Sequence, residues 1–105
     1  MKPIAILTTT GSLEEARTLA RALVERKLAA CAQISEIESI YRWQGAVRND
    51  KEYRVFIKTT KNMYGAVQRA IRELHSYELP AIFSLPVDEA YVPYAEWIAQ
   101  NSTGE

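Results

Sequence analysis

His75 is the only histidine in the sequence, and it follows a helical pattern over residues 62–74. The dipole at a helix C-terminus favours a cationic imidazole, while a neutral ring can bind metal or transfer protons. A metal site normally needs three or four ligands, and no second histidine or zinc-type Cys/His spacing occurs here. A capping or hydrogen-bonding histidine is therefore favoured over a metal site within one subunit. A metal bridging subunits, held by three copies of His75 or by His75 and a carboxylate, is the alternative.

Cys31 and Lys58 are the other side chains that could do chemistry. Cys31 follows two alanines at the start of a predicted strand, where a small buried cysteine is the usual role. A reactive thiolate there would need an adjacent base, for which His75 is the candidate. Lys58 and the helix N–H groups after it could hold an anion, but helix capping by Thr60 or Asn62 is the favoured interpretation. No Walker loop, dinucleotide fingerprint, paired-carboxylate motif or nucleophile elbow occurs, so local motifs give no support for an enzyme.

The hydrophobic pattern predicts the elements that position these residues. A short apolar run at residues 4–7 indicates a buried strand, and Ser12 with Glu15 predicts a capping box that opens a helix. Residues 30–43 and the alternating run up to residue 60 indicate two long strands joined by a turn at Gln44-Gly45. A second helix over 62–74, a strand over 81–87 and a final helix after Pro93 follow. We expect the residues after position 100 to be frayed.

Three aromatic or aliphatic residues, Tyr94, Trp97 and Ile98, are expected to point inward from the final helix. The resulting order, β-α-β-β-α-β plus a helix, is that of a ferredoxin-like split βαβ domain in the α+β class. At 105 residues the chain fits a single domain, residues 1–105.

Charge and composition exclude several classes of function. The 13 basic and 13 acidic residues cancel, whereas a nucleic-acid partner normally requires a basic excess. Apolar runs are far shorter than the roughly 20 residues of a membrane span, and the N-terminal residues resemble a strand rather than a signal peptide. The single cysteine excludes an internal disulfide, so a cytoplasmic location is expected.

The two long strands predict a symmetric oligomer. Arms of about a dozen residues would reach on the order of 40 Å, while helices of about 13 residues cover only about 20 Å. The projecting half carries Ile40, Tyr41 and Trp43, which are costly to expose, and its free edges call for pairing. We therefore expect these three residues at an interface between copies. A hairpin that folds back, or whose tip is mostly loop, is the alternative.

Several segments together resemble a known family, and their order and spacing carry the resemblance. The segments are Thr8-Thr9, Glu15-Ala16-Arg17, Leu28-Ala29-Ala30-Cys31, Ser39-Ile40-Tyr41-Arg42-Trp43-Gln44-Gly45, Ile57-Lys58-Thr59-Thr60, Glu73-Leu74-His75, Tyr77-Glu78-Leu79-Pro80, Leu85-Pro86-Val87, and Tyr94 with Trp97. In this the chain is similar to the CutA family, the divalent-cation tolerance proteins, over nearly its whole length. The resemblance implies a ferredoxin-like subunit in a homotrimer that resembles PII signalling proteins, with sheet edges paired between copies.

The resemblance also implies a cytosolic role in tolerance of copper and other heavy metals, without a defined biochemical activity. Family proteins commonly read His-Pro-Tyr where this chain has His75-Ser76-Tyr77, and the absent proline predicts a looser turn. The copper sites proposed for the family use a first-strand cysteine and neighbouring histidines. Of these only His75 carries over, because this strand ends Leu7-Thr8-Thr9 and Leu74 precedes the histidine.

The preferred hypothesis is a non-enzymatic, cytosolic homotrimer associated with divalent-cation tolerance. It requires no cofactor, although copper or zinc could bind with His75 as the main ligand, and its partner is itself rather than a nucleic acid or a membrane. We expect a ligand cleft between subunits near Lys58, His75, Tyr77 and Trp97. The alternatives are a PII-like small-molecule sensor and a small oligomeric enzyme that uses His75 as acid or base.

Overall fold

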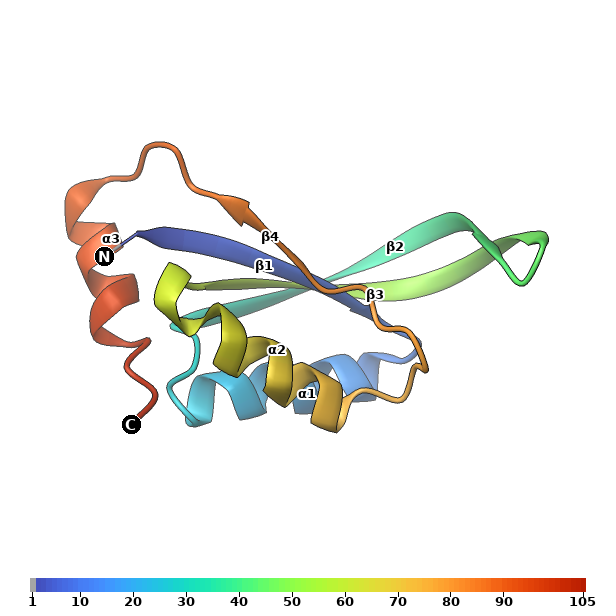
Figure 1. Ribbon diagram of the computed structural model, residues 1–105, viewed down its shortest axis with the longest axis horizontal. Helices are drawn as coiled ribbons and strands as arrows, with labels where there is room; N and C mark the ends of the chain where they lie inside the picture. The colour runs from blue at the N-terminus through green and yellow to red at the C-terminus, as the bar shows by residue number, and fades with distance from the viewer. Residues whose placement is uncertain (1) are drawn as a thin grey trace.

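The computed structural model describes residues 2–105. This part of the chain forms a four-stranded antiparallel sheet in the order β2-β3-β1-β4. Helices α1 (Leu13–Glu25) and α2 (Tyr64–Leu74) lie side by side under one face of the sheet, and α3 (Val92–Gln100) stands at the end where both termini lie (Figure 1). The strands are β1 (Pro3–Thr10), β2 (Cys31–Trp43), β3 (Ala46–Thr60) and β4 (Phe83–Pro86). The predicted fold class and element order are confirmed.

The core lies between the helices and the sheet. Alternate residues of the two central strands face the helices, because successive strand side chains point to opposite faces. The fully buried large side chains of this layer are Ile6, Leu19, Leu23, Val55, Ile57, Val67 and Ile71. Neither α1 nor α2 covers the opposite face of the sheet (Figure 1), and α3 contacts β1 and β3 at one end. On that opposite face, Phe83 and Leu85 of β4 are about half exposed, at 49% and 47%.

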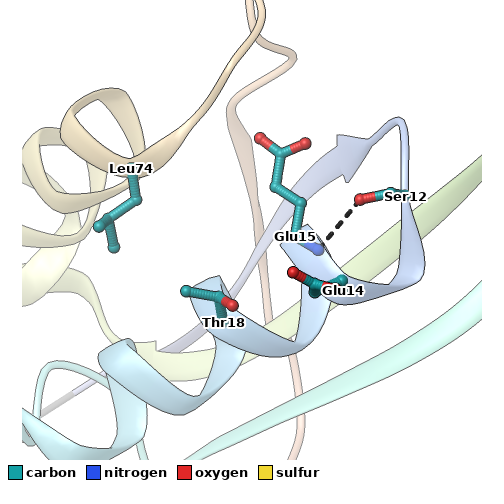
Figure 2. Close-up of a pocket in the computed structure, with 5 residues that line it drawn as sticks. All are labelled: Ser12, Glu14, Glu15, Thr18 and Leu74. Carbon is teal, nitrogen blue, oxygen red and sulfur yellow. Dashed lines mark hydrogen bonds between the residues drawn. The ribbon is translucent and has the colours of Figure 1, made fainter.

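The helix starts differ in part from the predictions. The Ser12 hydroxyl accepts a hydrogen bond from the Glu15 backbone N–H at 3.1 Å, as expected for an N-cap. The Glu15 carboxylate, however, points away from Ser12 (Figure 2) and binds the chain beyond α2. A 3₁₀ turn, Lys61–Met63, precedes α2, and no side chain caps it, because the Thr60 hydroxyl instead donates to the Asn62 side-chain oxygen.

The central hairpin projects far beyond the helices, as predicted (Figure 1). Strand β1 pairs with β3 only as far as Tyr53. Residues 37–52, which we call the distal hairpin, therefore form a ribbon of two strands paired only with each other, closed by a two-residue turn at Gln44 and Gly45. The longest axis of the molecule is 44 Å, whereas a helix as long as α1 spans only about 20 Å.

The C-terminal end corrects two expectations. Tyr94 and Trp97 are not inward but 39% and 41% exposed, while Ile98 is buried as predicted. The tail is packed rather than frayed, because Ser102 is buried and the Gly104 N–H donates to the Lys27 carbonyl at 2.8 Å.

Candidate functional site

The most densely bonded polar site surrounds the chain that crosses from α2 to β4. We call residues 75–82 the crossover. It leaves α2 at His75, whose backbone N–H still donates to the Ile71 carbonyl, and then passes the end of β1. A helix C-terminus leaves the following backbone in need of partners, and here the Ser76 N–H donates to Glu15 of α1, 61 residues away in sequence.

His75 is held between two backbone groups. Its imidazole is fully buried, its Nε2 lies 2.6 Å from the Thr9 carbonyl oxygen, and its Nδ1 lies 3.1 Å from the Tyr77 backbone nitrogen. A carbonyl can only accept and a backbone N–H can only donate. The ring is therefore neutral, with its proton on Nε2 and its Nδ1 lone pair occupied.

Glu15 and Ser76 fix the next residue of the crossover. The Glu15 carboxylate accepts from the Ser76 backbone N–H at 2.8 Å and from the Ser76 hydroxyl at 3.1 Å. His75 Nδ1 is 3.7 Å from the same carboxylate, but with Nδ1 accepting a hydrogen bond this contact is not an ion pair. Serine supplies two donors where a proline would supply none, and the looser turn expected from the absent proline stays a prediction.

Tyr77 attaches the crossover to the base of the distal hairpin. Its hydroxyl donates to the Glu52 carboxylate at 2.7 Å, and Glu52 is only 8% exposed. Burial, followed by this hydrogen bond, raises the pKa of Tyr77 above its ordinary value. The ring lies against Gly11, where an added Cβ would come within 3.2 Å of the hydroxyl oxygen. These contacts could not be read from the sequence, since they join residues of β1, β3 and the crossover.

Lys58 and Trp97 form a second cluster at the other end of β3. The Lys58 ammonium donates to the Tyr94 hydroxyl at 3.0 Å, which raises the pKa of Lys58, and it lies 5.3 Å from the centre of the Tyr94 ring. Tyr94 in turn stacks on Trp97, with ring centres 5.5 Å apart. The contacts of Tyr94 with Lys58 and Trp97 were not predicted from the sequence, although the spacing of Tyr94 from Trp97 was a signal.

The four predicted cleft residues are thus divided between two places. Tyr77 is bonded to Glu52, and Glu52 and Lys58 are six residues apart on β3. That separation corresponds to roughly 20 Å. His75 and Tyr77 do lie together, with ring centres 4.7 Å apart. A small ligand of one subunit therefore cannot contact all four side chains.

Cys31 is also remote from His75. Cys31 pairs with Lys58 on β3, while Thr9, the partner of His75, pairs with Arg54. These two positions are four residues apart along β3, or about 13 Å. The cysteine is half-buried, and the structure gives it no adjacent imidazole base.

A long groove runs between the distal hairpin and the crossover. Its volume is about 1540 Å³, and residues of β2, β3, the crossover and the start of β4 line it. Ile40, 68% exposed, and Leu79, 70% exposed, face it from its two sides. A smaller hollow of about 390 Å³ between α1 and Leu74 of α2 contains Glu14 and Glu15 as its only charged lining (Figure 2).

The metal-binding expectation does not fit the residues of one subunit. Within residues 2–105, no group of three or more His, Cys, Asp or Glu side chains is arranged to hold a metal. Both His75 nitrogens are engaged. In the same residues, no helix is long and apolar enough to cross a membrane.

The fold and this site define a ferredoxin-like α+β protein whose protruding hairpin and crossover share one groove. The family model described as "CutA1 divalent ion tolerance protein" matches residues 4–101, and the chain belongs to that family. It is similar to the divalent-cation tolerance protein CutA of Thermus thermophilus, with 42% identity over 98 residues, covering 92% of this chain and 95% of that protein.

Solved structures give the same result. A CutA structure from Archaeoglobus fulgidus, described as a periplasmic divalent cation tolerance protein, matches with a TM-score of 0.93 and 32% identity, covering 95% of this chain and 98% of that one. CutA1 from the psychrotrophic bacterium Shewanella sp. SIB1 matches with a TM-score of 0.93 and 36% identity, covering 97% and 96%.

Proposed function

We propose that this chain is a homotrimeric, non-enzymatic protein of divalent-cation tolerance. The observation that carries the proposal is the distal hairpin, whose Ile40 and Val47 are 68% and 65% exposed on a ribbon that pairs with no other strand within residues 2–105. A two-stranded ribbon is at best marginally stable in water. Copies of the chain would bury these side chains and complete the ribbon.

The two free sheet edges favour a closed ring over a dimer. Strand β2 is one edge and β4 is the other, so pairing β2 of one copy with β4 of the next is head-to-tail and closes when the rotation allows it. The count of three comes from the resemblance to CutA proteins. The half-exposed Phe83 and Leu85 on β4 would be covered in the same arrangement.

The ligand region of the trimer lies between subunits. Lys58 and Trp97 of one copy and the crossover of another are proposed to line it, because one chain holds them too far apart. The stacked Tyr94 and Trp97 with the Lys58 ammonium suit a planar anion. We place the protein in the cytoplasm on its single, unpaired cysteine, whereas the Archaeoglobus relative is described as periplasmic.

The non-enzymatic role rests on the titrating groups of the crossover. An acid or base should titrate near the working pH. The pKa of Tyr77 is instead raised away from neutrality by burial and Glu52, and His75 has no free nitrogen. Neither residue is placed to exchange a proton with a substrate.

Sedimentation equilibrium of the wild type and of Ile40→Glu tests the assembly. We expect a trimer for the wild type, and association weakened at least about tenfold for the variant, because an unpaired charge buried at an interface costs more than about 1.4 kcal/mol. Val24→Glu is the matched control, since Val24 is 39% exposed on α1, away from the hairpin. A monomeric wild type at micromolar concentration, or equal association of both variants, would contradict the proposal.

A further inference from the structure

We infer that His75 is a positioning residue, locked as the neutral Nε2–H tautomer between β1 and the crossover, and that it is not a metal ligand. A zinc or copper ligand needs an unshared nitrogen lone pair. Only one lone pair exists on a neutral imidazole, and in this chain it accepts the Tyr77 N–H at 3.1 Å.

The other nitrogen is equally committed. Nε2 donates to the Thr9 carbonyl at 2.6 Å, across 66 residues of sequence. Thr9 lies near the end of β1, beyond the last residue that β4 pairs with, which is Leu7. The hydrogen bond therefore attaches the crossover to a part of β1 that does not pair with β4.

The surroundings of the ring leave no room for a metal in place of these bonds. The side chain has no exposed surface, and Glu15, the nearest carboxylate, already accepts two hydrogen bonds from Ser76. Binding a metal would require the ring to give up Thr9 or Tyr77 and to move to the surface. That move would break the hydrogen bonds to the partly buried Thr9 carbonyl and to the Tyr77 N–H, at a cost in stability.

The role of His75 is to help hold the crossover in place as one wall of the groove. His75, Ser76 and Tyr77 are consecutive, and their side chains bond to β1, α1 and β3 respectively. Together they fix the crossover as one wall of the groove and set the point from which β4 starts. Tolerance of divalent cations by this protein then does not proceed through coordination by His75.

Long-range ¹H–¹⁵N NMR of the wild-type protein tests the tautomer directly, and the single histidine makes the assignment unambiguous. We expect one pyrrole-like Nε2 and one pyridine-like Nδ1 at neutral pH, with no change when Zn²⁺ is added. An Nδ1–H tautomer, an imidazolium, or a shift of the ring nitrogens with Zn²⁺ would overturn the inference.

Substitutions separate positioning from binding. Gln at position 75 can still donate a hydrogen bond to the Thr9 carbonyl, whereas Ala cannot. At equal subunit concentration, His75→Ala should therefore lower the thermal midpoint by roughly 5 °C or more. His75→Gln should lower it by clearly less. Zn²⁺ affinity by calorimetry should agree within about twofold for all three proteins. Zn²⁺ binding by the wild type that is lost in a folded His75→Gln protein would overturn the inference.

These contacts lie within one chain, so the NMR result does not depend on the number of subunits. A monomeric chain in sedimentation would remove the trimer and leave the role of His75 standing. If the protein is a trimer and the His75 ring nitrogens shift with Zn²⁺, the proposed assembly stands and the inferred role of His75 is overturned.

Discussion

Ser76 shows how a single side chain changes the exit from α2. A proline here, as the family resemblance led us to expect, would restrict the backbone without offering a donor. Serine lacks that restriction, but its N–H and hydroxyl both bind the Glu15 carboxylate. Hydrogen bonds to a charged group contribute about 1.5 to 3 kcal/mol each when buried and less when exposed, so these two bonds can replace the rigidity of the ring.

Tyr77→Phe should destabilise the protein through Glu52 rather than through lost packing. The variant removes the hydroxyl that donates to a carboxylate only 8% exposed. Losing a hydrogen bond to a buried charged group costs roughly 1.5 to 3 kcal/mol. Urea unfolding at fixed subunit concentration measures this. Tyr91→Phe, at a position 78% exposed, is the control and should be near neutral. Equal stability of the two variants would contradict a structural role for the Tyr77–Glu52 bond.

The pH dependence of the same bond has a definite sign. Burial and Glu52 raise the pKa of Tyr77 above the free value of 10.0, so the folded protein holds this proton more tightly. The stabilisation is fully present below pH about 10 and is lost as the pH rises through the raised pKa. In a tyrosinate absorbance titration, the transition missing from Tyr77→Phe should lie above the free tyrosine value of 10.0. A missing transition at or below that value would show that the hydroxyl is not held as described.

The hairpin is the element on which the proposed assembly depends, and its turn limits its stability. Gln44 and Gly45 both have positive φ, at 50° and 79°, as a two-residue turn between right-twisted strands requires. Glycine adopts this conformation freely, whereas residues with a Cβ are strained there.

Gly45→Ala is therefore expected to cost about 1 kcal/mol or more, although an added Cβ would meet nothing within 4 Å. Gly65→Ala is a matched control, because Gly65 lies in the first turn of α2 and has helical φ. There alanine should be neutral or stabilising by up to about 1 kcal/mol. Thermal unfolding of both variants measures the difference. Two variants with the same midpoint would mean that the turn conformation is not as described.

At one end of the molecule, the C-terminal residues pack against the segments that flank α1 and α2. Gly104 bonds to Lys27 beyond α1 and lies against Met63 before α2. The last residues thereby join the two helices of the core layer. At the opposite end, the Tyr77–Glu52 hydrogen bond holds the base of the distal hairpin, and within residues 2–105 the rest of that ribbon pairs with no other strand.

Deletion of residues 102–105 should thus destabilise the subunit by about 1 to 3 kcal/mol, because it removes the buried Ser102 and the Gly104–Lys27 hydrogen bond. Deletion of the exposed Glu105 alone is the control and should have little effect. Chemical unfolding compares the two truncated chains. A frayed tail, as the polar composition suggested, would make both deletions equally harmless.

The order of the elements, the helical core positions and the excess length of the hairpin all followed from the sequence. Side-chain periodicity and turn chemistry are local properties, so the two helices could be predicted without coordinates, and their Leu19, Leu23, Val67 and Ile71 are buried in the core. The family could also be predicted from the sequence, because the resemblance depends on the order and spacing of short local segments.

The partners of the polar residues could not be predicted in this way. His75 meets Thr9 across 66 residues, Ser76 meets Glu15 across 61, and Lys58 meets Tyr94 across 36. These meetings depend on the strand order β2-β3-β1-β4 and on the path of the crossover past β1. The sequence showed that His75 could bind a metal or a hydrogen-bond donor. The fold surrounds it with a carbonyl and an N–H, and these two groups leave the ring no free lone pair.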